Sequence, residues 1–179
     1  MKRTVSSVSK RLALAGALAA LATVLSYLEA ISGINSLMLP GTKIGLGNIA
    51  VILTAYTVSL TAASVVSVVR VAVMSLLFGS FTTFMFSLFG ALASYISIAF
   101  SKLVLQKRVS LIGVSVLSSA SHMVGQLAAA ALTLSDTSVF RLLPLYLVTA
   151  VVTGTLTGIV SQLCAYRLNY VAVKRQKER

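Results

Sequence analysis

The sequence predicts an all-α integral membrane protein, a bundle of six transmembrane helices with both termini in the cytoplasm. Three observations lead to this prediction. Hydrophobic residues make up 58% of the chain and charged residues only 10%, against about 25% charged residues in an average soluble domain. Apolar runs long enough to span a bilayer recur along the chain. Basic residues gather in clusters beside these runs, as they do on the cytoplasmic side of membrane helices.

The first apolar run extends from Leu12 to about Ile31 and follows a basic stretch, residues 1–11. A basic start before an apolar run also resembles a secretory signal. Three more apolar blocks follow, however, so we expect an uncleaved first helix with residues 1–11 in the cytoplasm. Gly33 interrupts the run, and Pro40-Gly41 indicates a loop.

The second apolar block, residues 48–100, contains Arg70 as its only charged residue. If the N-terminus is cytoplasmic, one crossing places Lys43 outside, whereas the basic cluster at 102–108 should lie inside. The block must therefore cross the membrane an odd number of times. One crossing would leave about thirty apolar residues unused, and five crossings do not fit. Three crossings fit if at least one helix is short, tilted or broken.

Two further blocks, residues 111–134 and 142–166, complete the six crossings. The transmembrane domain then covers residues 12–167, and residues 168–179 form a basic cytoplasmic tail. The net charge of +12 lies mostly in clusters flanking apolar runs, which favours contact with lipid headgroups over nucleic acid. We expect a multi-pass protein of the cell membrane.

Polar residues in or beside the apolar blocks are the candidates for a binding site. Lys43 and Asn48 flank a glycine pair, where Asn48 would cap a helix whose free amides suit a polar or anionic ligand; an ordinary turn is the alternative. Glu29 and Arg70 either form a structural ion pair or line a cavity. His122 and Gln126 share one helix face because they are four residues apart.

Small residues mark helix contacts. The first helix carries Ala13/Ala17 and Ala15/Ala19 at a spacing that permits close approach, and we expect this face to contact another subunit. Gly154 and Gly158 have the same spacing in the last helix, where packing within the bundle is the favoured interpretation.

Catalysis has little support in the sequence. Its three acidic residues, Glu29, Asp136 and Glu178, are far apart, whereas Mg²⁺-assisted diphosphate chemistry needs clustered carboxylates. No second His, Cys or carboxylate stands at metal-ligand spacing from His122. We therefore expect neither an enzyme nor a cofactor.

Several short segments together resemble the Gx transporter family, also labelled heptaprenyl diphosphate synthase component I. The segments are Leu28-Glu29, Pro40-Gly41-x-Lys43-x-Gly45-Leu46-x-Asn48-Ile49, Arg70 with Phe78-Gly79-Ser80, Phe86-Ser87-Leu88-x-Gly90, and Gly113-Val114-Ser115 leading to His122-x-x-Gly125-Gln126. The resemblance runs from about Leu12 to Val160. One departure is Met123, which stands where the family pattern has Asn.

The family is similar to the substrate-binding S components of energy-coupling factor (ECF) transporters. That resemblance implies a six-helix bundle that binds a small molecule from outside, together with a transmembrane coupling subunit and two cytoplasmic ATPases. It also implies that an alanine-rich face of the first helix contacts the coupling subunit, a face that Ala13, Ala15, Ala17 and Ala19 match. Two alternatives are a non-catalytic accessory subunit of prenyl diphosphate synthesis and a structural scaffold in a membrane complex.

Overall fold

The computed structural model describes residues 2–33, 45–78 and 81–177, and this part of the chain is helical without a strand. The prediction of an all-α protein is therefore confirmed. The long elements in chain order are α1 (Lys2–Ile31), α2 (Asn48–Thr57), α3 (Leu60–Phe78), α4 (Phe81–Phe100), α5 (Leu111–Leu134) and α6 (Leu143–Lys177). Short segments connect some of them: the π-helical η2 (Ser101–Leu105) and the 3₁₀-helical η3 (Gln106–Arg108) and η4 (Thr137–Leu142).

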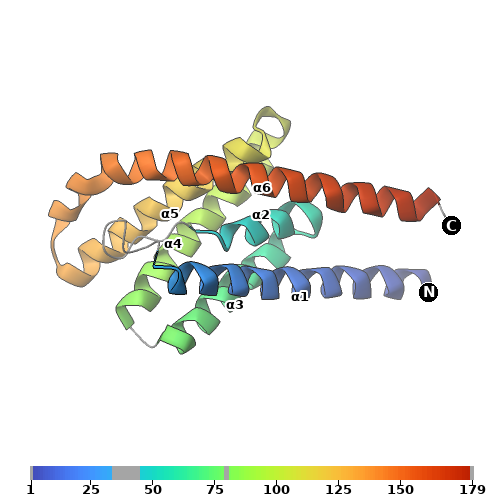
Figure 1. The fold of residues 1–179 in the computed structure, drawn as a ribbon, viewed down its shortest axis with the longest axis horizontal. Helices are drawn as coiled ribbons and strands as arrows, with labels where there is room; N and C mark the ends of the chain where they lie inside the picture. The colour runs from blue at the N-terminus through green and yellow to red at the C-terminus, as the bar shows by residue number, and fades with distance from the viewer. Residues whose placement is uncertain (1, 34–44, 79–80, 178–179) are drawn as a thin grey trace.

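Five helical stretches in the described residues are long and apolar enough to cross a membrane. The stretches are Val8–Ile31, Leu60–Phe78, Phe81–Leu105, Leu111–Leu134 and Thr137–Leu168. The sixth apolar helix, α2, has 10 residues and is about 15 Å long, half of a hydrocarbon core of about 30 Å. The expected short helix in block 48–100 is thus α2. Successive helices reverse direction, and the start of α1 and the end of α6 lie at the same end of the molecule (Figure 1).

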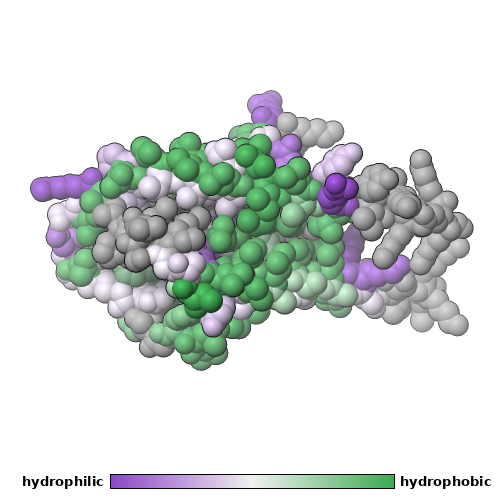
Figure 2. Space-filling model, in the orientation of Figure 1, coloured by the Kyte–Doolittle hydropathy of each residue, from purple (hydrophilic) through white to green (hydrophobic). Residues whose placement is uncertain are grey.

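The surface is apolar around the middle of the molecule and hydrophilic toward its ends (Figure 2). Large apolar side chains point outward without cover, among them Leu76, at 85% exposed, and Ile96, at 65%. Polar side chains of α5 are buried instead, including Ser118 and Gln126. Such a surface requires an apolar solvent, and the protein is a multi-pass membrane protein.

Helices α4, α5 and α6 pack closely because glycines bring their backbones together. A Cβ at Gly125 of α5 would collide with the carbonyl oxygen of Phe89 in α4. A Cβ at Gly154 or Gly158 of α6 would lie within 2.8 Å of an α5 Cα atom. The prediction that Gly154 and Gly158 serve packing within the bundle is confirmed. Hydroxyl pairs join the same helices, with Ser94 to Ser118 at 2.7 Å and Ser115 to Thr157 at 2.9 Å.

Helix α1 presents an open face of small residues. Ala13, Gly16, Ala17 and Ala20 are all exposed, and their spacing places them on one side of the helix. A Cβ at Gly16 would meet no atom within 4 Å. The structure divides the alanines of the predicted interface, because Ala15 and Ala19 are half-buried and Ala19 packs against the core.

The short helix α2 lies inside the bundle, with most of its residues buried. Its C-terminal turn ends within reach of Lys102 in η2, whose ammonium donates a hydrogen bond to the carbonyl oxygen of Ala55. The same ammonium lies 5.5 Å from the ring centroid of Tyr56, a cation–π distance. Lys102 therefore satisfies a helix end that would otherwise leave a carbonyl unpaired.

Candidate functional site

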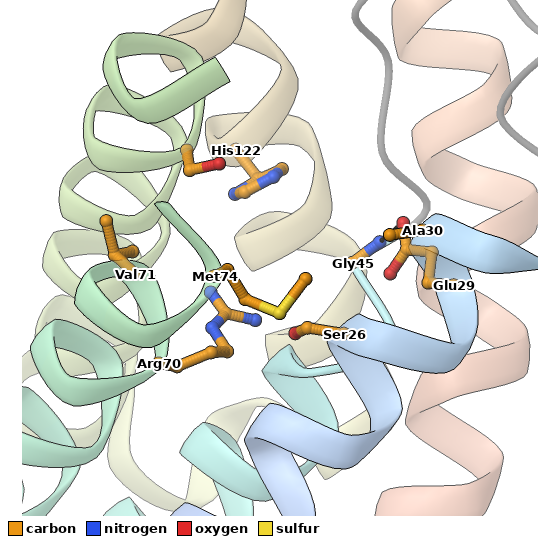
Figure 3. Close-up of a pocket in the computed structure, with 9 residues that line it drawn as sticks. Ser26, Glu29, Ala30, Gly45, Arg70, Val71, Met74 and His122 are labelled. Carbon is orange, nitrogen blue, oxygen red and sulfur yellow. Dashed lines mark hydrogen bonds between the residues drawn. The ribbon is translucent and has the colours of Figure 1, made fainter. Parts of the chain in front are cut away.

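A small polar cavity lies where α1, α3, α4 and α5 meet the turn that opens α2 (Figure 3). Its volume is about 30 Å³, enough for one or two water molecules. The cavity is lined by Ser26, Glu29, Ala30, Gly45, Arg70, Val71, Met74, Ser87 and His122. It lies toward the end of α1 that is remote from the N-terminus. Glu29, Arg70 and His122, predicted separately from the sequence, are brought together here.

Glu29 fixes the turn that precedes α2. It is 3% exposed, and its two carboxylate oxygens accept one backbone hydrogen bond each. Gly45 N–H donates to Oε1 at 2.9 Å, and Leu46 N–H donates to Oε2 at 2.9 Å. Charge-assisted bonds of this kind are the strong ones. The carboxylate therefore binds the two backbone amides of the turn that precedes α2.

Arg70 places a cation inside the bundle. It is 6% exposed, and its Nη2 donates to Oδ1 of Asn48 at 3.0 Å. Its charge is attracted by Glu29 across the cavity. A guanidinium has five N–H donors, so one hydrogen bond uses a small part of its capacity. Figure 3 shows its planar group directed toward Met74 and Ser26.

Asn48 differs from its predicted role. The N-cap position of α2 is Gly47, which makes no side-chain capping bond, and Asn48 is the first helical residue. The Asn48 side chain orients Arg70 instead, while its Nδ2 is buried with no hydrogen-bond partner among the described residues. Asn48 thus contacts Arg70 from outside the cavity lining, and its Nδ2 is a donor without a partner among the described residues.

Glycine is required at two positions of the turn before α2, for a different reason at each. Gly45 has φ +83°, a conformation that glycine adopts without strain. At Gly47 an added Cβ would collide with the Ser26 hydroxyl and with the Arg70 guanidinium. The turn therefore leaves space for the charged group that lines the cavity.

His122 and Gln126 lie on one face of α5, as predicted, and both are buried, at 4% and 2% exposed. They pack against Gly90 of α4, where a Cβ would lie 2.6 Å from His122 Cε1 and 3.1 Å from Gln126 Cγ. In the part of the chain that the structure describes, neither atom of the Gln126 amide has a hydrogen-bond partner. A buried amide in this state costs about 1–3 kcal/mol.

Lys43 lies outside the described residues. Met123, the departure from the family pattern, packs with Leu127, Tyr146 and Ala150, so its side chain belongs to the contact between α5 and α6 and does not line the cavity. Sequence reasoning missed Ser26 and Met74 as lining residues. Their only signal is helical spacing, three residues before Glu29 and four after Arg70.

The site is equipped for recognition by hydrogen bonds and charge. No group of three or more His, Cys, Asp or Glu side chains that could hold a metal ion occurs in residues 2–33, 45–78 and 81–177. The cavity is lined by the Arg70 guanidinium, the His122 imidazole and the Glu29 carboxylate, and the Asn48 and Gln126 amides lie next to these groups. Such a set can hold a small polar ligand in an apolar bundle.

The family model described as heptaprenyl diphosphate synthase component I matches residues 18–164. This range includes every described residue that lines the cavity. No curated protein and no solved structure matches the chain. The chain belongs to the heptaprenyl diphosphate synthase component I family, as its sequence motifs predicted.

Proposed function

We propose that this family member is the substrate-binding subunit of an ECF-type uptake transporter for a small molecule. It has no catalytic centre or ATPase of its own. The observation that carries the proposal is the polar cavity inside an apolar bundle, with a buried cation in its lining and, next to it, amide groups that have no hydrogen-bond partner among the described residues. Ionisable residues within a membrane are costly and usually serve a function, and a bound ligand would supply the missing hydrogen bonds.

The partner surface of this proposal is the open face of α1, made by Ala13, Gly16, Ala17 and Ala20. It lies beside a groove of about 320 Å³ lined by Arg11, Ala15, the Val58-Ser59 turn and neighbouring residues of α3. Small residues permit close approach of another helix in a membrane, where van der Waals contact drives association. The partner is a transmembrane coupling subunit that connects to two cytoplasmic ATPases.

In the cell membrane, the proposed orientation places both termini in the cytoplasm and the cavity in the outer half of the bilayer. Single cysteines test it in a Cys164→Ser background with a membrane-impermeant thiol reagent. Thr137→Cys, beside the exposed Asp136, is expected to be labelled in intact cells. Arg108→Cys is expected to be labelled only after lysis. The reverse pattern contradicts the orientation.

The partner surface is tested by co-purification in mild detergent. Replacing Ala13 and Ala17 with Leu should abolish recovery of an ABC-type ATPase pair, because the larger side chains prevent close helix approach. Ala72→Leu, on the exposed side of α3, is the matched control and should leave recovery unchanged. Normal assembly of the double variant would assign the α1 face to lipid contact.

The binding site is tested by mass spectrometry of small molecules retained by the purified protein. Folded Lys43→Ala, Asn48→Ala and His122→Ala variants should each bind the retained compound more weakly by about 1–3 kcal/mol, the cost of an unpaired buried group. Unchanged affinity in all three moves the site elsewhere.

A second candidate function is favoured by the family description, heptaprenyl diphosphate synthase component I. In that case the chain is a non-catalytic membrane subunit that accompanies a soluble prenyl synthase. The same co-purification discriminates the two functions, since recovery of a synthase with Asp-rich motifs in place of an ATPase pair selects the second.

A further inference from the structure

An apolar slot adjoins the polar cavity between α3 and α4. Its volume is about 140 Å³, close to the engineered cavity of about 150 Å³ that binds benzene in another protein. The slot is lined by Ser64, Ser67, Val68, Val71, Leu88, Ala91, Leu92 and Tyr95. It carries no charged side chain.

Val71 joins the slot to the polar cavity, because it lines both. On α4 the lining passes from Ser87 in the cavity to Leu88 in the slot. On α3 the slot continues from Val71 back to Ser64, about 10 Å at the rise of an α-helix. The two spaces therefore lie next to each other with Val71 as a shared wall, Arg70 lining one and uncharged side chains lining the other.

The charges of Glu29 and Arg70 indicate which kind of ligand group would fit the polar cavity. Both carboxylate oxygens of Glu29 accept hydrogen bonds from backbone amides, so the protein itself supplies partners for this negative charge. Among the residues that the structure describes, Arg70 donates one hydrogen bond, to Asn48, and a guanidinium has five donors. An acceptor-rich group such as a carboxylate is the natural partner of a guanidinium with unused donors. The lining of this cavity of about 30 Å³ includes Met74, an unbranched side chain that can repack around a bound group.

We infer that the substrate is a small amphiphile, with an anionic, carboxylate-like head beside Arg70 and an apolar tail about the size of a benzene ring between α3 and α4. This assignment rests on the proposed function and specifies the substrate class of that site. Val68 and Leu92 at the rim of the slot are 59% and 49% exposed, so the tail subsite opens sideways to the bilayer. The tail belongs to the substrate, and a phospholipid acyl chain is the competing occupant.

The test uses 3-phenylpropanoate as the probe, with 3-phenylpropan-1-ol lacking the charge and acetate lacking the tail. Binding is measured by equilibrium dialysis of labelled probe against the full-length protein in nanodiscs, with empty nanodiscs as background. We expect saturable binding of 3-phenylpropanoate, tighter than that of either fragment by roughly tenfold or more, because both ends of the probe are matched. Absence of saturable binding to the wild-type protein overturns the inference.

Ala91→Phe separates the tail subsite from the head. Ala91 is 4% exposed and lines the slot, so a ring there should reduce 3-phenylpropanoate to the affinity of acetate. Ala72→Phe adds the same ring to the exposed side of α3 and should change nothing. Leu88→Ala enlarges the slot and should shift preference toward 3-(2-naphthyl)propanoate, which keeps the test decisive if Ala91→Phe does not fold.

The outcomes distinguish the two proposals. If Arg70→Gln abolishes binding while Ala91→Phe and Leu88→Ala leave it unchanged, the proposed cavity stands and the tail assignment is wrong. Loss of retained phospholipid in Ala91→Phe with normal probe binding assigns the slot to a lipid, which also overturns the inference. Unchanged binding in Arg70→Gln removes the cavity as the head site and contradicts the binding site of the proposed function itself.

Discussion

The two halves of the bundle bury polar groups in opposite ways. Helices α4, α5 and α6 use neutral hydroxyl pairs, such as Ser94 with Ser118, and glycines that bring the backbones into contact. Helices α1, α2 and α3 use charges, with Glu29 bound to two amides and Arg70 bound to Asn48. A hydrogen bond between neutral side chains of membrane helices contributes about 0.6 kcal/mol on average, whereas a buried charge that loses its partner destabilises a protein by about 3–5 kcal/mol. The cavity lies where these two halves meet.

The comparison also separates a closely packed part from an open one. Gly125 contacts the backbone of α4, while Gly16 of α1 has free space around it. Helix α1 thus contributes Ser26 and Glu29 to the cavity on one side and an uncovered small-residue face on the other. The half that carries the charged groups is also the half with an uncovered face of small residues.

The largest expected effect comes from removing the buried cation. Arg70→Met should destabilise the protein by about 3 kcal/mol or more, because Glu29 is left as an uncompensated charge in the bundle. The measurement is chemical unfolding in detergent micelles, followed by circular dichroism. The double variant with Glu29→Gln is the control, and it should lose less than the sum of the two single variants. Strict additivity would show that the two charges do not interact.

Next in size is a pair of glycine substitutions that contrasts the two halves. Gly125→Ala should cost about 1–3 kcal/mol, since its Cβ overpacks against the Phe89 carbonyl. Gly16→Ala should be neutral or stabilising by up to about 1 kcal/mol, because the site is open and alanine favours helix. Thermal unfolding of both variants under one condition compares them, and equal effects would remove the distinction between a packed and an open region.

The third prediction concerns the contact between α4 and α5 at the cavity, where the two halves of the bundle meet. Gly90→Ala introduces a Cβ 2.6 Å from the His122 imidazole. The imidazole ring must then rotate away from this Cβ, and we expect this to lower the stability of the protein by about 1 kcal/mol. His122 is the only histidine of the chain, so its ¹⁵N imidazole NMR signals report the change without assignment. Gly16→Ala should leave these signals in place, and unshifted signals in Gly90→Ala would contradict the packing described here.

The smallest expected effect concerns the neutral half. Ser118→Ala should cost about 0.6 kcal/mol, the average for a hydrogen bond between membrane helices. Adding Ser94→Ala should cost little more, because the same bond is removed only once. Unfolding in detergent measures both variants. A loss comparable to that of Arg70→Met would mean that hydroxyl pairs, too, are essential to the bundle.

The bundle was largely predictable because hydropathy and charge operate over whole segments. Runs of about 20 apolar residues identify long helices, and parity required a short, tilted or broken helix in block 48–100, where α2 is the short one. The spacing of His122 and Gln126 correctly placed them on one buried face. These predictions depend on periodicity within one helix, which the sequence contains directly.

The cavity was predictable only in part because its contacts join distant segments. Glu29 accepts hydrogen bonds from amides 16 and 17 residues away. Because every residue except proline has a backbone N–H, the sequence does not show which amides a carboxylate will bind. Which alanine pair of α1 is exposed could not be predicted from the sequence, for a related reason. Spacing shows that Ala13 and Ala17 share a face and that Ala15 and Ala19 share another, but which face turns inward depends on how α1 rotates against α2 and α3.

Helix α2 has contacts at both ends that tie it to other parts of the bundle. At its start Asn48 accepts a hydrogen bond from the cavity cation Arg70, and near its end the Ala55 carbonyl accepts one from Lys102. Because α2 is one continuous helix, its two ends keep a fixed separation. The short helix therefore connects the lining of the cavity, through Asn48, to η2, the segment that follows α4, through Ala55.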